Sequence, residues 1–388
     1  MFTPLRDYNQ NKEKYQTAIN TVLEHGRFIN GPEIGELEEK LANYIKVKHC
    51  IAVSSGTDAL LVALMALNVK PGDSVITVAH TWISTAEVIS VLGAKPIFVD
   101  INPDNFCLNM DLVQELMIKK REKGEKLPVG IIYVSLYGQS EDPEKICKIA
   151  RDNNLWVIED GAQSFGSVHT NTKTGKKTPS CSWGDVGCTS FFPSKPLGGY
   201  GDSGACFTNN DEMASKLRAI KNHGGARRFC HTYVGLNARM DTIQAAVLLV
   251  KFGTFVEGGG LNARRKIANI YDEQLNEIKG LTLPHKVEGV EHAWAQYSML
   301  VSDELMQQKG YTNRDAIVEK LKESGIQVSV FYPKGLHLQE AFKDNMEIYK
   351  DLGTTEYVCD HVLNLPLFPE LTDQELNKIV NTIKSIFQ

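Results

Sequence analysis

Long apolar runs and an excess of basic residues are both missing from this sequence. No apolar run approaches the roughly 20 residues that a helix needs to cross a bilayer, and Met1-Phe2-Thr3-Pro4 does not open a secretory signal peptide. The net charge of the 388 residues is −5 at neutral pH, so the chain has no basic footprint of the kind that binds nucleic acid. We therefore expect neither a membrane nor a nucleic acid as a partner.

Paired cysteines are also lacking. The 8 cysteines are scattered along the chain, and no C-x-x-C pair of the kind used for zinc or redox chemistry occurs. Several of them lie in apolar runs, where a free cysteine behaves as a small hydrophobic residue. This usage suits the reducing cytoplasm, and we expect a cytoplasmic protein without a metal site.

The composition that is present is that of a soluble globular protein, with 42% hydrophobic and 23% charged residues. Between residues 51 and 210, short β-rich runs alternate with helical patterns. This alternation predicts a mainly parallel sheet with helices on both faces, the α/β class. The predicted strands are 51–53, 74–78, 95–99, 130–135, 156–159, 188–192 and 204–208.

Helices are predicted on both sides of this region. The spacing of apolar residues indicates two amphipathic helices within 8–45, separated by a turn at 26–32. A helix over 242–251 leads toward a second domain. Gly253 and the run Gly258-Gly259-Gly260 then predict a break or a flexible segment, because each glycine costs about 1 kcal/mol in a helix interior.

The last third of the chain reads as a smaller α/β domain. Strand-like runs at 295–301 and 327–332 lie between helical patterns at 313–323 and 372–386. Residues 169–181 are polar and predict a solvated hairpin. We predict a large domain over residues 1–250 and a small C-terminal domain over 251–388.

The stretch 189–205 contains one lysine, Lys195, among apolar and aromatic side chains and before a run of glycines. Burial of an ammonium group lowers its pKa, which makes the free amine available as a nucleophile that captures carbonyl groups. The glycines permit positive φ angles and let the backbone approach a bulky ligand closely. Taken alone, the stretch fits a glycine-rich loop with a surface lysine equally well.

A second stretch, 155–166, places Asp160 at the end of a short buried strand, where open α/β sheets hold ligand-binding groups. Pyridoxal 5'-phosphate (PLP) needs such an acid, because a carboxylate beside the pyridine nitrogen keeps it protonated and the ring electron-poor. Asp160 could instead cap a helix beginning near Ala162. A nucleophilic lysine and an acid in one chain favour the cofactor interpretation over either feature alone.

A third stretch turns from a strand through Ser54-Ser55-Gly56-Thr57 into an apolar helical run. Free N–H groups at a helix start, together with hydroxyl groups, form an anion site suited to a phosphate. An ordinary N-cap explains this stretch equally simply, and alone it would be the preferred explanation.

The sequence resembles the DegT/DnrJ/EryC1/StrS family, the nucleotide-sugar aminotransferases of aminotransferase fold type I, over nearly its whole length. The resemblance implies a large domain with a mainly parallel seven-stranded sheet, in which one strand is antiparallel, a smaller C-terminal α/β domain, and PLP as cofactor. The motifs that carry it, in the family's order, are Ser55-Gly56-Thr57, Glu159-Asp160-Gly161-Ala162-Gln163, Phe192-Pro193-Ser194-Lys195 and Gly235-Leu236-Asn237-Ala238-Arg239-Met240-Asp241.

The resemblance also implies roles for individual residues. Lys195 would be the catalytic residue, and Asn237 would reach the phosphate of a partner subunit, which makes a homodimer with shared active sites. Arg239 could bind a substrate carboxylate with two hydrogen bonds, and Tyr332 and His337 match a segment near the sugar. Taken alone, His337 would more often be a packed histidine. The cofactor-binding residues implied in this way are Ser55, Gly56, Thr57, Trp82, Asp160, Gln163, Ser190, Lys195 and Asn237.

The implied reaction moves an amino group from L-glutamate to a keto nucleotide-sugar. The run 193–202 most resembles enzymes of cell-surface polysaccharide and glycoconjugate synthesis that act on C3 of UDP-linked 3-keto-sugars or 3-keto-hexuronates. Three alternatives stay open. They are a 4-keto-sugar aminotransferase, a non-catalytic PLP-binding regulator, and a sugar dehydratase of the same fold, which would carry a histidine in place of Lys195.

Overall fold

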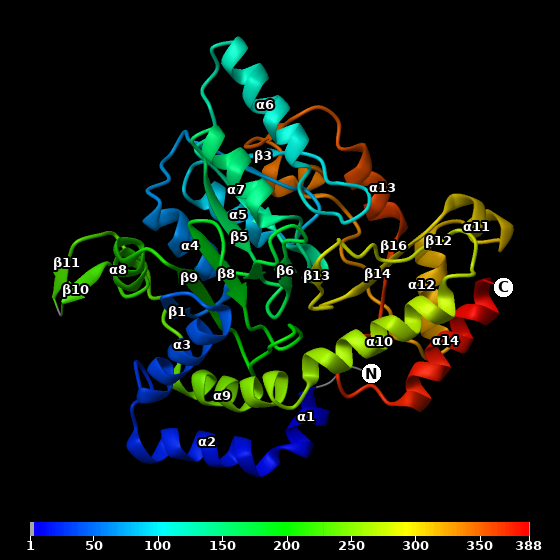
Figure 1. Cartoon of the computed structure of the whole chain (residues 1–388), viewed down its shortest axis with the longest axis horizontal. Coiled ribbons are helices and arrows are strands. Elements are labelled where there is room, and N and C mark those ends of the chain that lie inside the picture. Colours follow the sequence, from blue (N-terminus) through cyan, green and yellow to red (C-terminus); the bar gives the residue numbers. More distant parts are fainter. Residues whose placement is uncertain (1–3, 228, 388) are drawn as a thin grey trace.

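The computed structural model describes residues 4–227 and 229–387. Its centre is an eight-stranded sheet with strand order β1-β9-β8-β5-β4-β2-β3-β15 (Figure 1). The strands from β8 to β15 pair in parallel, whereas β9 is antiparallel to both β8 and β1. The strands are β1 (His49–Val53), β2 (Ser74–Thr77), β3 (Lys95–Phe98), β4 (Gly130–Val134), β5 (Trp156–Asp160), β8 (Val186–Ser190), β9 (Gly204–Thr208) and β15 (Glu347–Ile348).

This sheet confirms the α/β class and the seven predicted strands, including the single antiparallel one. The eighth strand, β15, has only two residues and comes from the C-terminal part of the chain, where it pairs with β3. So short a segment has no periodicity of its own to predict it.

Helices cover both faces of the sheet, because successive strand residues point to opposite sides. In β4, Ile132 packs into the core cluster that holds α4, α5 and α8, whereas Ile131 and Tyr133 pack into the cluster that holds α6 and α7. The helices are α4 (Gly56–Ala66), α5 (Ser84–Val91), α6 (Met110–Glu122), α7 (Pro143–Asp152) and α8 (Asp211–Ile220).

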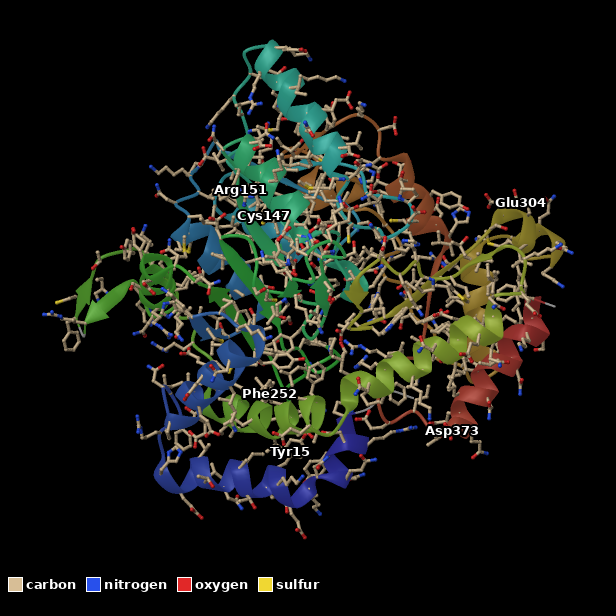
Figure 2. All side chains as sticks on the ribbon, in the orientation of Figure 1. Tyr15, Cys147, Arg151, Phe252, Glu304 and Asp373 are labelled. Carbon is tan, nitrogen blue, oxygen red and sulfur yellow. The ribbon has the colours of Figure 1, made fainter. Side chains whose placement is uncertain are left out.

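Three N-terminal helices and α9 form the lower layer in Figure 1. The chain leaves its second helix at Gly26, whose φ of 69° is the left-handed conformation that commonly ends helices, and the predicted turn follows. Tyr15 is fully buried where α2 packs against α9 (Figure 2). These helices are α1 (Pro4–Gln10), α2 (Lys12–His25), α3 (Pro32–Ile45) and α9 (Thr242–Val256).

The glycine-rich segment interrupts the helices later than its first glycine. Gly253 lies inside α9, which continues to Val256, and α10 (Gly260–Leu275) begins after Gly259 adopts a φ of 74°. The break that Gly258-Gly259-Gly260 predicts is therefore present, at 257–259. It lies a few residues beyond residue 250, where we predict the domain boundary.

The C-terminal part has a core of its own, drawn from residues between 267 and 387. Two predicted helices are present in it as α12 and α14, and a small sheet has the order β12-β14-β16. Its elements are α11 (Asp303–Gln308), α12 (Arg314–Glu323), α13 (Gly353–His361), α14 (Asp373–Phe387), β12 (Leu281–Thr282), β14 (Tyr297–Val301) and β16 (Val362–Leu365). The two-domain division stays a prediction, because β15 crosses back to the large sheet.

The predicted strand at 327–332 is wrong. In the described chain this segment makes a single bridge, between Ser329 and Asn364, and then departs from the ladder. The N–H of Phe331 donates to the side-chain Oδ1 of Asn364 at 2.8 Å, so a side chain replaces the next rung. The aromatic residues at its end, Phe331 and Tyr332, instead line the cavity described below, whereas Val328 packs in the C-terminal core.

Two hairpins leave the layers. The polar segment 169–181 forms the predicted hairpin from β6 (Val168–Thr170) and β7 (Lys177–Pro179), and β13 (Val290–Glu291) pairs with β6. A second hairpin, of β10 (Gly225–Arg227) and β11 (Cys230–His231), projects beyond α8 at the left of Figure 1. Among the described residues, no helix is long and apolar enough to cross a membrane.

Candidate active site

A cavity of about 480 Å³ opens where β4, β5 and β8 end at their carboxyl ends. Open parallel sheets bind ligands at this edge, because loops from neighbouring strands meet there. The starts of α4 and α5 line the cavity, and a segment of the C-terminal part closes one side. Nine of the predicted site residues line it: Ser55, Gly56, Thr57, Trp82, Asp160, Gln163, Ser190, Lys195 and Tyr332.

Lys195 lies in a tight turn directly after β8. Its backbone N–H donates to the carbonyl of Phe192 at 2.8 Å, and a Cβ on Gly198 would lie 2.4 Å from the carbonyl oxygen of Pro193. Only glycine therefore lets the chain fold back so closely. Burial lowers the pKa of the Lys195 ammonium, while the carboxylate of Asp160 acts in the opposite direction. A lowered pKa increases the fraction of nucleophilic free amine near neutral pH.

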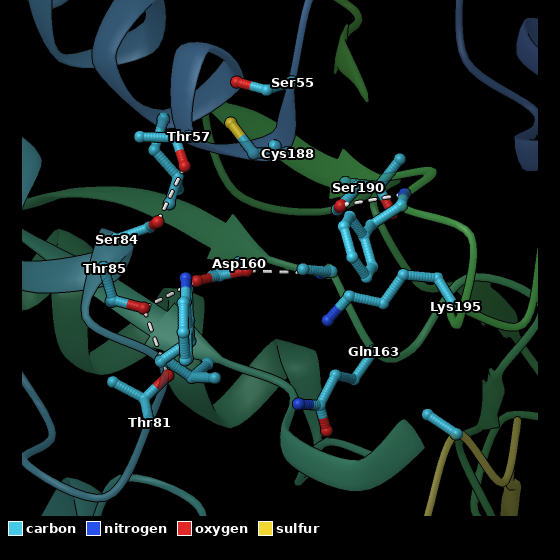
Figure 3. Close-up of a pocket in the computed structure, with 18 of the residues that line it drawn as sticks. Ser55, Thr57, Thr81, Ser84, Thr85, Asp160, Gln163, Cys188, Ser190 and Lys195 are labelled. Atoms are coloured by element: carbon cyan, nitrogen blue, oxygen red, sulfur yellow. Dashed lines mark hydrogen bonds between the residues drawn. The ribbon is translucent and has the colours of Figure 1, made fainter. Parts of the chain in front are cut away.

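Asp160 faces Lys195 across the cavity (Figure 3). Its carboxylate accepts hydrogen bonds from the Thr85 hydroxyl at 2.8 Å and from the Ala162 N–H at 3.2 Å. Burial raises the pKa of Asp160, and these two donors and Lys195 lower it. Residues 162–166 form turns and no helix begins near Ala162, so the helix-capping interpretation is wrong, and Asp160 presents an acid to the cavity.

The neighbouring acid, Glu159, points to the other face of β5. It accepts hydrogen bonds from the hydroxyls of Ser135 and Ser180 and from the N–H of Cys181, at 2.8, 2.6 and 2.6 Å. Burial raises its pKa to about 7 against the effect of these donors. Glu159 therefore joins the segments that follow β4 and β7 beneath the site, and it does not line the cavity.

The start of α4 forms the polar end of the cavity. Ser55 caps the helix, since its Oγ accepts from the N–H of Asp58 at 3.0 Å. A Cβ on Gly56 would lie 2.6 Å from the Cβ of Ser190, so glycine is required where α4 meets the end of β8. The N–H groups of a first helical turn have no partner within the helix and carry the positive end of its dipole. Both interpretations of this stretch are therefore compatible in one structure.

The opposite wall of the cavity consists of aromatic rings and a side-chain amide. Trp82 is 60% exposed, which is unusual for a tryptophan and leaves its ring open to the cavity. Gln163 accepts from the N–H of Tyr137 through Oε1 at 2.8 Å, which directs its amide NH₂ group to the hydroxyl of Tyr332 at 3.1 Å. Because Oε1 accepts from Tyr137, the NH₂ end of the Gln163 amide must be the end that faces Tyr332.

Three predicted site residues lie outside the lining of this cavity. Asn237 is exposed, and Arg239 donates from Nη1 to Asn222 at 2.7 Å. No hydrogen-bond partner among the described residues reaches the buried Nε of Arg239. His337 is 7% exposed and lies 3.1 Å from Glu356 through Nε2, which is a packed position. Arg228, which precedes these residues in the chain, lies outside the described residues.

The residues present fit PLP. One cavity brings together an amine with a lowered pKa, an acid opposite it, an open aromatic face and a helix start that a side chain on Gly56 would fill. Lys195 would hold the aldehyde end, Asp160 the pyridine nitrogen, and Gly56, Thr57 and Ser190 the phosphate. Thr85, which orients Asp160, has no sequence signal, because its partner lies 75 residues away.

Comparison with known proteins places this chain in a family. The model of the DegT/DnrJ/EryC1/StrS aminotransferase family matches residues 9–384. A Pseudomonas aeruginosa UDP-2-acetamido-2-deoxy-3-oxo-D-glucuronate aminotransferase is 42% identical, over 93% of this chain and 92% of that protein. An Acidithiobacillus ferrooxidans UDP-N-acetyl-3-dehydro-alpha-D-glucosamine 3-aminotransferase is 34% identical, over 99% and 95%.

A third relative, a Geobacillus stearothermophilus pleiotropic regulatory protein, is 37% identical over 98% of this chain and 96% of its own. Among solved structures, a DegT DnrJ EryC1 StrS aminotransferase from Brucella abortus superposes with a TM-score of 0.91 at 36% identity, over 100% and 99% of the two chains. The Bacillus subtilis protein ntda, solved with bound cofactor PMP, superposes with a TM-score of 0.82 at 30% identity, over 98% and 82%.

Proposed function

The chain belongs to the DegT/DnrJ/EryC1/StrS aminotransferase family, and from that premise we propose that it transfers an amino group from L-glutamate to C3 of a UDP-linked 3-keto-sugar or 3-keto-hexuronate. The enzyme class and the cofactor follow from the family, so the protein is a PLP-dependent aminotransferase. The observation that carries the proposal is the convergence of Lys195, Asp160 and the start of α4 on one cavity.

PLP, when bound, supplies an electron-poor ring that stabilises the carbanion formed at the reacting carbon. The chain supplies the proton transfers. The Nζ of Lys195, once free, takes the proton from Cα of the amino donor and later delivers a proton to C3 of the sugar. Its buried surroundings keep the amine unprotonated more readily than in water, which this role as a base requires.

Asp160 and the polar end of the cavity bind and orient the cofactor. The carboxylate of Asp160 keeps the pyridine nitrogen protonated, and the Thr85 hydroxyl holds that carboxylate in place. The first turn of α4 and Ser190 hold the phosphate, where the positive end of the helix dipole favours negative charge. Trp82 offers its open ring to the face of the cofactor.

The choice of a 3-keto acceptor rests on the named relatives, because two of them carry 3-oxo or 3-dehydro sugars in their names. Arg239 is the residue we assign to the carboxylate of a hexuronate. Its guanidinium has one nitrogen on Asn222 and a buried Nε without a partner in the described chain, so it retains donors for a carboxylate.

We propose that Asn237 and Arg239 act across a homodimer. Both lie outside the cavity of their own chain, in a segment next to the projecting β10–β11 hairpin. Apolar side chains are exposed beside this hairpin, with Val234 at 87% and Tyr233 at 41%. Exposed apolar surface next to expected site residues supports an interface that a second copy of the chain covers.

Two alternatives have support of their own. A 4-keto nucleotide-sugar would be aminated by the same cofactor chemistry, and the residues that line the cavity do not distinguish C3 from C4 of the acceptor sugar. The similarity to a relative named as a pleiotropic regulatory protein supports the second alternative, a non-catalytic PLP-binding role. An amine and an acid placed opposite one another favour turnover, since binding alone would not require Lys195 to be free to move a proton.

The test is an amination assay with purified protein, L-glutamate and a panel of UDP- and dTDP-linked 3-keto and 4-keto sugars. The proposal expects the fastest turnover with a UDP-linked 3-keto-sugar, and with its uronate in particular. Preference for a 4-keto-sugar would replace the proposed acceptor. Absence of turnover with every sugar, in a protein that binds PLP, would favour the regulator.

A further inference from the structure

His80 and Tyr137 form a buried chain of hydrogen bonds behind the cavity. His80 follows β2 and is fully buried, with Nε2 at 2.9 Å from the Tyr137 hydroxyl and Nδ1 at 3.3 Å from the Sγ of Cys359 in α13. The Tyr137 hydroxyl in turn donates to the carbonyl of Phe331. These hydrogen bonds therefore connect the large sheet to two separate segments of the C-terminal part.

The direction of these bonds follows from the number of hydrogens available. A phenol has one hydrogen, and Tyr137 gives it to the carbonyl of Phe331, so its oxygen must accept from His80. Burial lowers the pKa of His80 to about 3, so the ring is neutral and has a single N–H. We assign that hydrogen to Nε2, which leaves Nδ1 to accept from the thiol of Cys359.

The segment at the end of this chain forms a wall of the cavity. Phe331 is held on both sides, by Asn364 at its N–H and by Tyr137 at its carbonyl. The next residue, Tyr332, lines the cavity and accepts from Gln163, and its ring lies 6.2 Å from that of Trp82. The position of Tyr332 is thus set by contacts that reach it from the large sheet.

Tyr137 is itself held in an uncommon conformation. Its φ is 57°, in the left-handed region that residues other than glycine seldom adopt. Its N–H donates to Gln163, and its carbonyl accepts from Ala295 at 3.0 Å. Strain of this kind persists where surrounding contacts over-determine a residue, and it is concentrated at functional sites.

We propose that His80 and Tyr137 are positioning residues that hold Phe331 and Tyr332 against the cavity and so shape the binding place of the acceptor sugar. This inference rests on the proposed aminotransferase function, because it assigns the wall to the sugar. The groups assigned to the cofactor come mostly from other elements, which are β5, the β8 turn and the start of α4. Loss of the Tyr137 hydroxyl should therefore disturb the sugar and leave the cofactor in place.

The first test compares Tyr137→Phe with Tyr133→Phe. Tyr133 is a matched control, because it is fully buried on β4 and its hydroxyl accepts from the N–H of Glu141 at 3.3 Å, away from Phe331. Tyr137→Phe should raise KM for the keto-sugar by about ten-fold, the effect of one lost hydrogen bond. The kcat, the half-reaction with the amino donor and the PLP content should stay within about two-fold. An equal loss in both half-reactions would overturn the proposal.

A second measurement does not depend on the acceptor. Amide hydrogen exchange over residues 329–335 should rise by about three-fold or more in Tyr137→Phe and stay unchanged in Tyr133→Phe. Unchanged exchange in Tyr137→Phe would overturn the positioning role, even if the enzyme aminates the proposed sugars. Raised exchange in a protein that aminates none of them would overturn the proposed function and leave the positioning of Tyr332 standing.

His80 is tested through its partner. His80→Leu alone leaves the Tyr137 hydroxyl without its donor, so the double variant with Tyr137→Phe keeps the experiment informative where the single variant folds poorly. If both residues act through one chain, the double variant should raise KM no further than about the larger of the single effects. If the two single-variant effects on KM multiplied in the double variant, the residues would act independently, and the proposed chain of hydrogen bonds would be wrong.

Discussion

The cavity and the segment 222–239 differ in how completely one chain builds them. In the cavity, Lys195, Asp160 and the start of α4 are already arranged around one space, and each is held by contacts from its own chain. In the segment, Asn237 is exposed and Arg239 has a buried Nε that nothing in the described chain satisfies. The groups of the first region are all held by their own chain, whereas the second region has the features of a surface that a partner chain covers.

This difference separates two kinds of prediction. Changes in the cavity should act within the chain that carries them, and their size should follow the chemistry of the lost group. Changes in the segment should act on a neighbouring chain, so that their effect depends on dimer formation. The variants below, ordered by the size of the expected effect, test that division.

Lys195→Ala should have the largest effect. Without the amine that moves the proton, kcat should fall by about 10³-fold or more, while sugar binding stays intact. Borohydride reduction of the wild-type protein loaded with PLP should place the label on Lys195, as read by peptide mapping. Lys148→Ala, at an exposed lysine of α7, is the control and should keep full activity. Label on any other lysine would contradict the assignment.

Asp160→Asn should lower kcat by about 100-fold, because an amide cannot keep the pyridine nitrogen protonated as a buried carboxylate does. Glu159→Gln is a matched control on the same strand, pointing to the opposite face. It should lower the melting temperature and leave kcat near the wild-type value. If Glu159→Gln lowered kcat as much as Asp160→Asn, the two faces of β5 would not divide the roles as described.

The sequence predicts much of this site because its signals are local. Strand ends, a glycine before a helix and a lysine before glycines are patterns of a few residues, and the sheet brings Asp160 and Lys195 together once its strands are in order. The chain of His80, Tyr137 and Phe331 has no local pattern. Its members lie 57 and 194 residues apart, and only folding shows that they touch.

The run 327–332 shows a different limit. Its composition favours a strand, since β propensity measures how a residue fits a half-buried pleated surface. In the structure the run leaves the ladder after Ser329, because the side chain of Asn364 replaces the next backbone rung, and its two aromatic residues line the cavity. Likewise, β15 is too short to have a pattern, and its pairing with β3 follows from where the C-terminal part lies.

Arg239→Ala should weaken turnover of a 3-keto-hexuronate by about ten- to a hundred-fold, since a hydrogen bond to a charged group is worth roughly 1.5–3 kcal/mol. Arg239→Lys should also lose activity, because lysine keeps the charge without the planar fork. A neutral 3-keto-sugar should respond much less. The two half-reactions must be measured separately, because glutamate also carries carboxylates. Equal losses for both sugars would refute recognition of the uronate by Arg239.

Val234→Ser should have the smallest effect, a rise of about five- to ten-fold in the dimer dissociation constant, as expected for one exposed valine that association buries. Sedimentation or mass photometry across a dilution series measures it. Ile118→Ser is the control, because Ile118 is 46% exposed on α6, away from the β10–β11 hairpin. Equal dissociation constants for Val234→Ser and the wild type would remove the hairpin region from the interface.

Mixing two inactive variants tests the central division most directly. In a heterodimer of Lys195→Ala with Asn237→Ala, one site would combine an intact Lys195 with an intact Asn237 from the other chain. Random exchange at equal amounts should therefore restore about a quarter of the wild-type activity, since half of the dimers would be mixed and each would hold one intact site. If native mass spectrometry verifies subunit exchange and the mixture still recovers no activity, Asn237 does not act across a dimer.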